Sequence, residues 1–225
     1  MVLLESTAAG DLLSARTPSM TLLSAPVCVF SHCCRIVLLE KDVECSIEYV
    51  SARDDPARLG ESNPYGETPT LLDRELTLYG TSVVIEYLDE RFPHPPLMPV
   101  DPIARAKTRL MIMRLSRDWL TPISELEVAE ALIGMGAKKS GAPAALKRSI
   151  RDGLLALSPL FAQQPFFLSD EYTVADAYFT PLLWRLLALG VQLPSPADAL
   201  LAYGERMFKR PAFAASLSPQ EATLR

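Results

Sequence analysis

The sequence has no long hydrophobic run and no excess of basic charge, and each lack excludes a class of protein. No apolar stretch reaches the roughly 18 residues that a helix needs to cross a membrane. The chain carries 22 Lys and Arg against 27 Asp and Glu, which gives a formal net charge of −5. Because nucleic acid is held mainly through its phosphates by a basic surface, direct binding to DNA or RNA is not expected.

Cysteine is also scarce, and its placement argues against disulfides. Three of the four cysteines fall within seven positions. A chain of 225 residues can bury a sufficient core without disulfide bonds. We therefore expect the cysteines to act as small apolar side chains, in a protein of the reducing cytoplasm. A zinc site built from Cys28, His32 and Cys33 or Cys34 is disfavoured, because tetrahedral sites usually come as paired spacings. No metal is expected, and the cysteines are Cys28, Cys33, Cys34 and Cys45.

The first 19 residues lack the positive start of a secretory signal, since Glu5 and Asp11 precede any basic residue. We expect residues 1–19 to form a flexible extension ahead of Met20. The sequence leaves open whether translation begins at Met1 or at Met20.

Hydrophobic patterns predict a small α/β domain over residues 20–92. A strand, a helix and a second strand form a βαβ unit, and a turn-rich irregular stretch then leads to a hairpin and a closing helix. On the closing helix Val84, Ile85 and Leu88 should face inward, whereas Glu86, Asp89 and Glu90 should face outward. The predicted elements are 21–23, 32–41, 46–50, 70–72, 76–79 and 81–91, with the irregular stretch at 54–66.

A proline-rich segment separates this domain from a predicted all-helical one. Five prolines in residues 92–102 favour a stiff, extended linker, assigned to 93–101. Asp101 followed by Pro102 is typical of a helix start, and no convincing strand follows. The fold class is therefore α/β plus all-α, with the helical domain at 102–225. Its predicted helices are 103–133, 144–161, 173–189 and 197–208.

Two short motifs have specific structural meanings. Thr68-Pro69 stands at the entry to a predicted strand after a βαβ unit. In thioredoxin-like domains a cis-proline at this place turns the preceding backbone outward, toward an extended peptide-like ligand. Thr173 and Asp176 open an apolar helix with the spacing of a capping box, which predicts a structural role for both residues.

Several blocks of sequence resemble the glutathione S-transferase superfamily from about Met20 to Ser216. A second set of segments within this range is similar to the bacterial stringent starvation protein A family: Ser31-His32 ahead of Arg35, and the blocks 73–78, 86–100 and 181–185. The resemblance implies a thioredoxin-like N-terminal domain, a helical C-terminal domain and a homodimer. The blocks that carry the wider resemblance are 35–41, 63–71, 85–93 and 173–176.

The resemblance also shows what a transferase site would need. Such a site uses a Glu or Gln followed by Ser at the start of the third helix, and these positions fall on Gly80 and Thr81. Losing one hydrogen bond to a charged ligand group costs about 1.5–3 kcal/mol, or roughly ten- to over a hundredfold in affinity. We therefore expect no glutathione cofactor and no substantial transferase activity. The vestigial glutathione site comprises Thr68, Pro69, Gly80 and Thr81.

A competing interpretation assigns chemistry to Cys28, seven positions before Arg35. Omega-class transferases and glutaredoxin-like relatives carry a nucleophilic cysteine at the mouth of a helix, where the pKa of a thiol is lowered. The proline that those enzymes place next is Val29 here. A glutathione-dependent thiol transferase using Cys28 therefore remains the alternative to a non-enzymatic protein.

The resemblance implies instead that the linker forms the surface that binds a protein partner. A pocket around Pro-His-Pro is implicated in the transcriptional role of the stringent starvation protein A family, and it maps onto Pro93, His94 and Pro95. Asp101 stands at a rim position that can be aromatic in that family. The implied partner is RNA polymerase holoenzyme, bound through protein contacts.

The basic residues of the helix after the linker are expected to be solvated or to form ion pairs between domains or subunits. They are Arg105, Lys107, Arg109, Arg114 and Arg117.

Overall fold

Four strands form one mixed sheet in the N-terminal half, in the order β2-β1-β3-β4. β1 runs parallel to β2 and antiparallel to β3, and β3 pairs with β4 as a hairpin. The βαβ unit and the hairpin predicted from the sequence are thus confirmed. The computed structural model describes residues 20–51, 55–135 and 142–225, so the predicted extension 1–19 lies outside the described residues. The strands are β1 (Met20–Ser24), β2 (Ser46–Tyr49), β3 (Thr70–Asp73) and β4 (Leu76–Tyr79).

Three helices belong to the same half: α1 (Val29–Glu40), α2 (Pro56–Ser62) and α3 (Thr81–Arg91). α1 starts before the predicted His32, and α2 lies in the stretch that was predicted to be irregular. The start of α2 combines a capping Asp55, whose carboxylate accepts from the Arg58 amide, with Pro56 at the first helical position. The sequence carries this helix-start signal in Asp55-Pro56, inside the stretch predicted to be irregular.

The C-terminal half is helical, and its only strand pairing within the described residues is the isolated bridge between Phe166 and Ser169. The predicted helix 103–133 is divided by a π-helical turn, and the predicted helix 173–189 ends at Arg185. A short helix opened by Pro211 was not predicted. The elements are α4 (Pro102–Leu115), the π-turn η1 (Ser116–Leu120), α5 (Thr121–Gly134), α6 (Ala142–Leu157), η2 (Ser158–Ala162), α7 (Val174–Arg185), η3 (Ser195–Ala197), α8 (Asp198–Phe208), α9 (Pro211–Ser216) and η4 (Glu221–Thr223).

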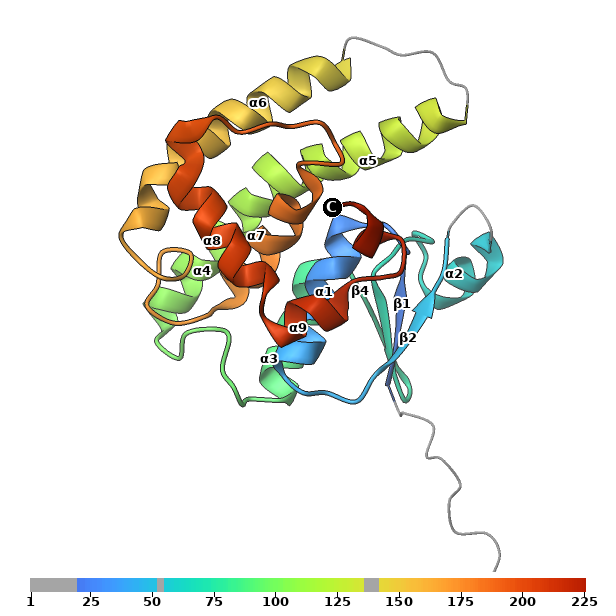
Figure 1. Cartoon of the computed structure of the whole chain (residues 1–225). Helices are drawn as coiled ribbons and strands as arrows, with labels where there is room; N and C mark the ends of the chain where they lie inside the picture. The colour runs from blue at the N-terminus through green and yellow to red at the C-terminus, as the bar shows by residue number, and fades with distance from the viewer. Residues whose placement is uncertain (1–19, 52–54, 136–141) are drawn as a thin grey trace, which may run out of the picture.

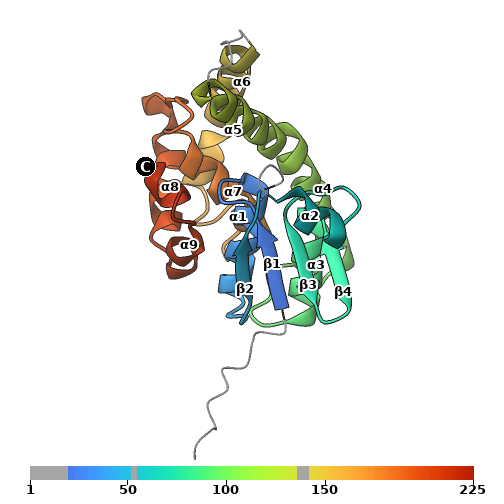
Figure 2. The same cartoon turned by 90° about the vertical axis from the view of Figure 1, so that its right-hand side faces the viewer.

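α1 is the central element of the molecule. Figure 1 shows it between the sheet and the helices of the C-terminal half, and Figure 2 shows the sheet covering its other side. Cys33, Cys34 and Ile36 on α1 belong to the same buried cluster as Tyr178 and Phe179 on α7. α1 is buried on nearly all sides, although it also carries the polar residues Ser31, His32 and Arg35. One continuous core therefore joins the two halves.

The capping box at the start of α7 is confirmed. The Thr173 amide donates to the Asp176 carboxylate at 2.9 Å, and the Thr173 hydroxyl accepts from the amide of Ala175 at 3.3 Å. Asp176 also accepts from the Phe167 amide and from the Tyr203 hydroxyl. It therefore joins α7 to α8 and to the preceding loop, which is more than a helix cap requires.

None of the helices in the described part of the chain is both long and apolar enough to span a bilayer.

Candidate functional site

The residues predicted to form a vestigial glutathione site lie in two places, the loop before β3 and the start of α3. The Thr68–Pro69 peptide bond is cis, as the motif predicts. The side chain of Asn63 fixes this loop, because its amide donates to the Glu67 carbonyl and to the Thr70 hydroxyl. The role of Thr68 and Pro69 toward a ligand stays a prediction.

At the start of α3 the structure explains why a ligand-binding side chain is difficult to place. Gly80 precedes the helix with φ of 82°, a left-handed conformation that favours glycine. Thr81, the first residue of α3, is buried, and no side chain caps the helix. A Glu or Gln at position 80 would be strained by the backbone even though a Cβ there meets no atom within 4 Å. Position 80 thus lacks a carboxylate or amide group, and its backbone conformation does not favour a residue that would supply one.

Cys28 does lie at the mouth of α1, as the alternative requires, but its surroundings disfavour the thiolate. It is the N-cap residue, and its Sγ accepts from the Ser31 amide at 3.5 Å. Burial raises the pKa of this thiol above its usual 9.0, and the carboxylate of Glu127 raises it further. Glu127 Oε2 also accepts from the Val29 amide at 3.2 Å. A carboxylate of the chain itself therefore occupies the helix terminus that would otherwise stabilise a thiolate.

We expect iodoacetamide to alkylate Cys28 more slowly at pH 7.5 than it alkylates a free cysteine, because the raised pKa reduces the thiolate fraction. In a Cys45→Ser background, Glu127→Gln should speed the reaction by removing the negative charge. Each unit by which the pKa falls raises the thiolate fraction about tenfold. Glu130→Gln is the matched control, since Glu130 pairs with Lys147 instead. Fast alkylation of the unmodified Cys28 would contradict this account.

A buried cluster of charges lies behind Cys28 and joins α1, α7 and the C-terminal segment. The carboxylate of Glu221 accepts from both Arg35 and Arg185, and all three side chains are at most 2% exposed. Arg185 also donates to Glu127 at 2.5 Å. Two arginines are thus balanced by two glutamates in the core, a requirement for buried charges.

His32 belongs to this cluster and is neutral. Its Nδ1 lies 3.0 Å from Arg185 Nη1, so it accepts, and Nε2 donates to the Ser216 hydroxyl at 2.8 Å. Burial lowers the pKa of His32 well below 6.5, and the positive charges of Arg185 and Arg35 lower it further. His32 is therefore a structural residue. No group of three His, Cys, Asp or Glu within the described residues is arranged to hold a metal.

The Pro93-His94-Pro95 segment is exposed, and a buried lysine binds its backbone. The side chains of all three residues face solvent, and the His94–Pro95 peptide bond is cis. The buried Lys41 at the end of α1 donates to the Phe92 carbonyl at 2.8 Å and to the Pro95 carbonyl at 2.6 Å. The segment is thereby fixed to the core at both ends.

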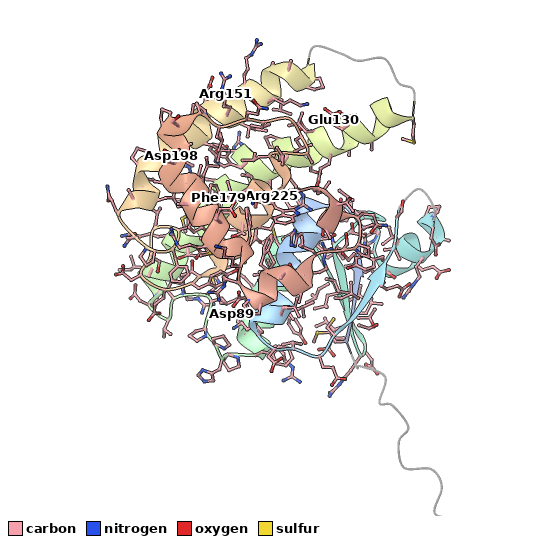
Figure 3. The ribbon with its side chains drawn as sticks, viewed as in Figure 1. Asp89, Glu130, Arg151, Phe179, Asp198 and Arg225 are labelled. Carbon is pink, nitrogen blue, oxygen red and sulfur yellow. The ribbon has the colours of Figure 1, made fainter. Side chains whose placement is uncertain are left out.

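Asp89 completes this support and corrects the expectation that it faces outward. It is only 7% exposed, pairs with Lys41 at 2.5 Å and accepts from the Leu97 amide at 2.9 Å. Figure 3 shows Asp89 on α3, close to where this helix ends. Lys41 and Asp89 were not identified as functional from the sequence. The sequence shows Asp89 four positions before a proline-rich run. This spacing does not reveal that Lys41 is its basic partner.

Asp101 and the basic helix behave largely as predicted. Asp101 is exposed and caps α4, since its carboxylate accepts from the Ala104 amide at 2.7 Å. Arg105 and Arg109 pair with Glu90 and Glu86 across the two halves. The predicted interdomain ion pairs are thus confirmed for these two arginines.

Together the cis-proline, the mixed sheet and the helical half define the glutathione S-transferase class of fold. The pattern for the glutathione S-transferase N-terminal domain matches residues 22–96, and that for the C-terminal domain matches residues 110–211. The solved structure of a glutathione S-transferase from Rhodospirillum rubrum F11 superposes with a TM-score of 0.80. It is 21% identical, with 92% of this chain and 95% of that one covered. At this identity the likeness shows the fold alone.

Closer relatives define the family within that class. The stringent starvation protein A homolog of Pasteurella multocida is 43% identical over 88% of this chain and 90% of its own length. The homolog of Coxiella burnetii is 41% identical over 92% of this chain and 95% of its own length. The chain belongs to the stringent starvation protein A family.

Proposed function

We propose that this protein is a cytoplasmic transcription regulator that associates with RNA polymerase holoenzyme through protein contacts and has no substantial glutathione transferase activity. The observation that carries the proposal is the exposed Pro93-His94-Pro95 segment, fixed to the core through Lys41. Membership of the stringent starvation protein A family supports the same role.

The rigidity of the segment suits it to binding another protein. Prolines on both sides of His94 remove backbone freedom, and the Lys41 hydrogen bonds fix both ends of the segment. A surface that is already ordered loses less entropy when it binds. The partner contacts are proposed to come from Pro93, His94 and Pro95, with Asp101 at the rim.

The proposed lack of transferase activity follows from the ligand cleft. Gly80 provides no carboxylate or amide for glutathione, and its φ of 82° disfavours a residue that would. The pKa of Cys28 is raised, so the thiol-transfer alternative lacks an activated nucleophile. These two features support a scaffold rather than an enzyme.

A homodimer is proposed from the family and from one exposed face. The pairs Arg109–Glu86 and Arg105–Glu90 fasten α3 to α4, so the outer sides of these helices form a continuous surface. Apolar side chains of both helices are more than half exposed on them, which favours an interface. They are Val83, Leu110 and Met113.

The scaffold proposal is tested with tagged protein as bait in a bacterial cell extract. RNA polymerase subunits should co-purify with the unmodified protein, and His94→Ala should lower their recovery severalfold while the thermal unfolding midpoint stays unchanged. Pro219→Ala is the control, because it alters an exposed proline outside the segment. Equal polymerase recovery with both variants would contradict the proposed role of His94.

Glutathione titration tests the enzymatic alternative. Calorimetry should detect no binding tighter than about 1 mM, which corresponds to roughly −4 kcal/mol. Tighter binding, together with a thiol-transfer activity that Cys28→Ala removes, would favour the omega-like transferase instead.

A further inference from the structure

A cavity of about 350 Å³ lies in the helical half, away from Cys28 and from the Pro93-His94-Pro95 segment. Its walls come from α4, the π-turn η1, the end of α6, η2 and the loop that follows η2. This volume lies within the range of small-molecule sites. The Pro93-His94-Pro95 segment contributes no residue to this cavity, whereas Leu110 of the proposed dimer face belongs to its lining.

The π-turn and a glycine shape the apolar floor of the cavity. A π-turn adds one residue to a helical turn and often marks a functional site; here it carries Asp118 and Trp119, which both line the cavity. A Cβ at Gly153 on α6 would lie only 2.5 Å from Cη2 of Trp119. Gly153 therefore permits the indole to lie against the α6 backbone, where it leaves the cavity open.

The opposite wall presents an apolar side chain held by an unusual backbone. Leu168 lines the cavity, is 49% exposed and has a φ of 56°. Leucine is uncommon in this left-handed conformation. The neighbouring Phe167 is buried and stacks on Phe179 with ring centroids 4.8 Å apart. The buried Phe167 thus anchors this loop, and Leu168 adds apolar surface to the cavity.

Two cations on one face of α4 give the cavity its charge. Lys107 and Arg114 are two turns apart, so both point to the same side of the helix. Within the described residues neither side chain forms an ion pair or a hydrogen bond, in contrast to Arg105 and Arg109 on the same helix. The single acidic residue in the lining is Asp118, so the lining carries two positive charges and one negative charge.

We propose that this cavity binds a small amphipathic anion, namely a carboxylate on an aliphatic or aromatic body. The apolar body lies against Trp119 and Leu168, and Arg114 and Lys107 bind the head group. A single carboxylate matches the net charge of the lining, and a guanidinium can bind both of its oxygens at once.

Calorimetric titration with decanoate below its micellar concentration tests this proposal. The unmodified protein should bind one decanoate per chain, and decyltrimethylammonium, which has the same chain length and the opposite charge, should not bind. Arg114→Gln should weaken decanoate binding about ten- to a hundredfold, because a hydrogen bond to a charged group is lost. Arg117→Gln is the matched control: it removes an exposed arginine that does not line the cavity, and should change binding less than about twofold.

A second variant tests the shape of the site. Gly153→Ala should push the indole of Trp119 into the cavity and weaken decanoate binding, because the added Cβ would lie only 2.5 Å from the ring. The proposal is overturned by equal effects of Arg114→Gln and Arg117→Gln, by equal binding of the cationic probe, or by no saturable binding. If decanoate does not bind and Arg114→Gln changes only the dimer dissociation constant, a second copy covers this surface.

Discussion

Replacing Glu221 with glutamine is expected to lower the free energy of unfolding by about 3–5 kcal/mol, because it leaves two buried arginines with too little negative charge. Glu221 is fully buried and binds both Arg35 and Arg185. Only Glu127 would then face these guanidinium groups. Urea unfolding followed by the fluorescence of Trp184, whose indole donates to the Glu221 carbonyl, measures the loss.

Glu205→Gln is the matched control for this experiment. Glu205 also pairs with an arginine, Arg225, but it is 51% exposed. Exposed pairs contribute about 0–1 kcal/mol, so this variant should unfold near the urea concentration of the unmodified protein. A Glu221→Gln variant as stable as Glu205→Gln would show that the buried charges do not depend on each other.

The Glu221 cluster also shows what the sequence could and could not reveal. Arg35 and Arg185 lie in the segments that carry the family resemblance, but Glu221 lies 186 positions after Arg35. No hydrophobic period or local spacing links residues at that separation, because such patterns report only on neighbours along one helix or strand. The pairing depends on how α7 and the C-terminal segment pack on α1, which is a tertiary property.

Local signals, in contrast, were reliable where they were strong. The alternation in 46–50, the apolar pattern in 81–91 and the capping residues at Thr173 and Asp101 each define a local structure by themselves, and the structure contains all four. Asp89 was misplaced because a charged residue on a helix is expected to face water. It is buried instead, since a lysine from another helix neutralises it.

The sequence placed the candidate residues on their elements but could not show what surrounds them. Gly80 and Thr81 could be read from the sequence as poor substitutes for a glutathione-binding pair, and the φ of Gly80 adds a backbone reason. For Cys28 the sequence correctly placed the thiol at the mouth of α1. It could not show that Glu127, on a helix 99 positions away, raises the thiol pKa and occupies the helix terminus.

Replacing Lys41 with methionine is expected to abolish polymerase recovery and to lower the free energy of unfolding by about 3–5 kcal/mol, because Asp89 is left as an unpaired buried charge. The carbonyls of Phe92 and Pro95 lose their donor at the same time. Urea unfolding and recovery of polymerase subunits on tagged protein measure the two effects. Lys209→Met is the control, since Lys209 is exposed and lies outside this network.

A double variant separates stability from positioning in this network. Lys41→Met combined with Asp89→Leu removes both charges, and apolar replacements of a buried ion pair are often neutral. Unfolding should then approach that of the unmodified protein. Polymerase recovery should stay low, because no side chain fixes the Pro95 carbonyl or receives the Leu97 amide. If the double variant recovers polymerase fully, Lys41 contributes only stability and the Pro93-His94-Pro95 segment needs no support from α1.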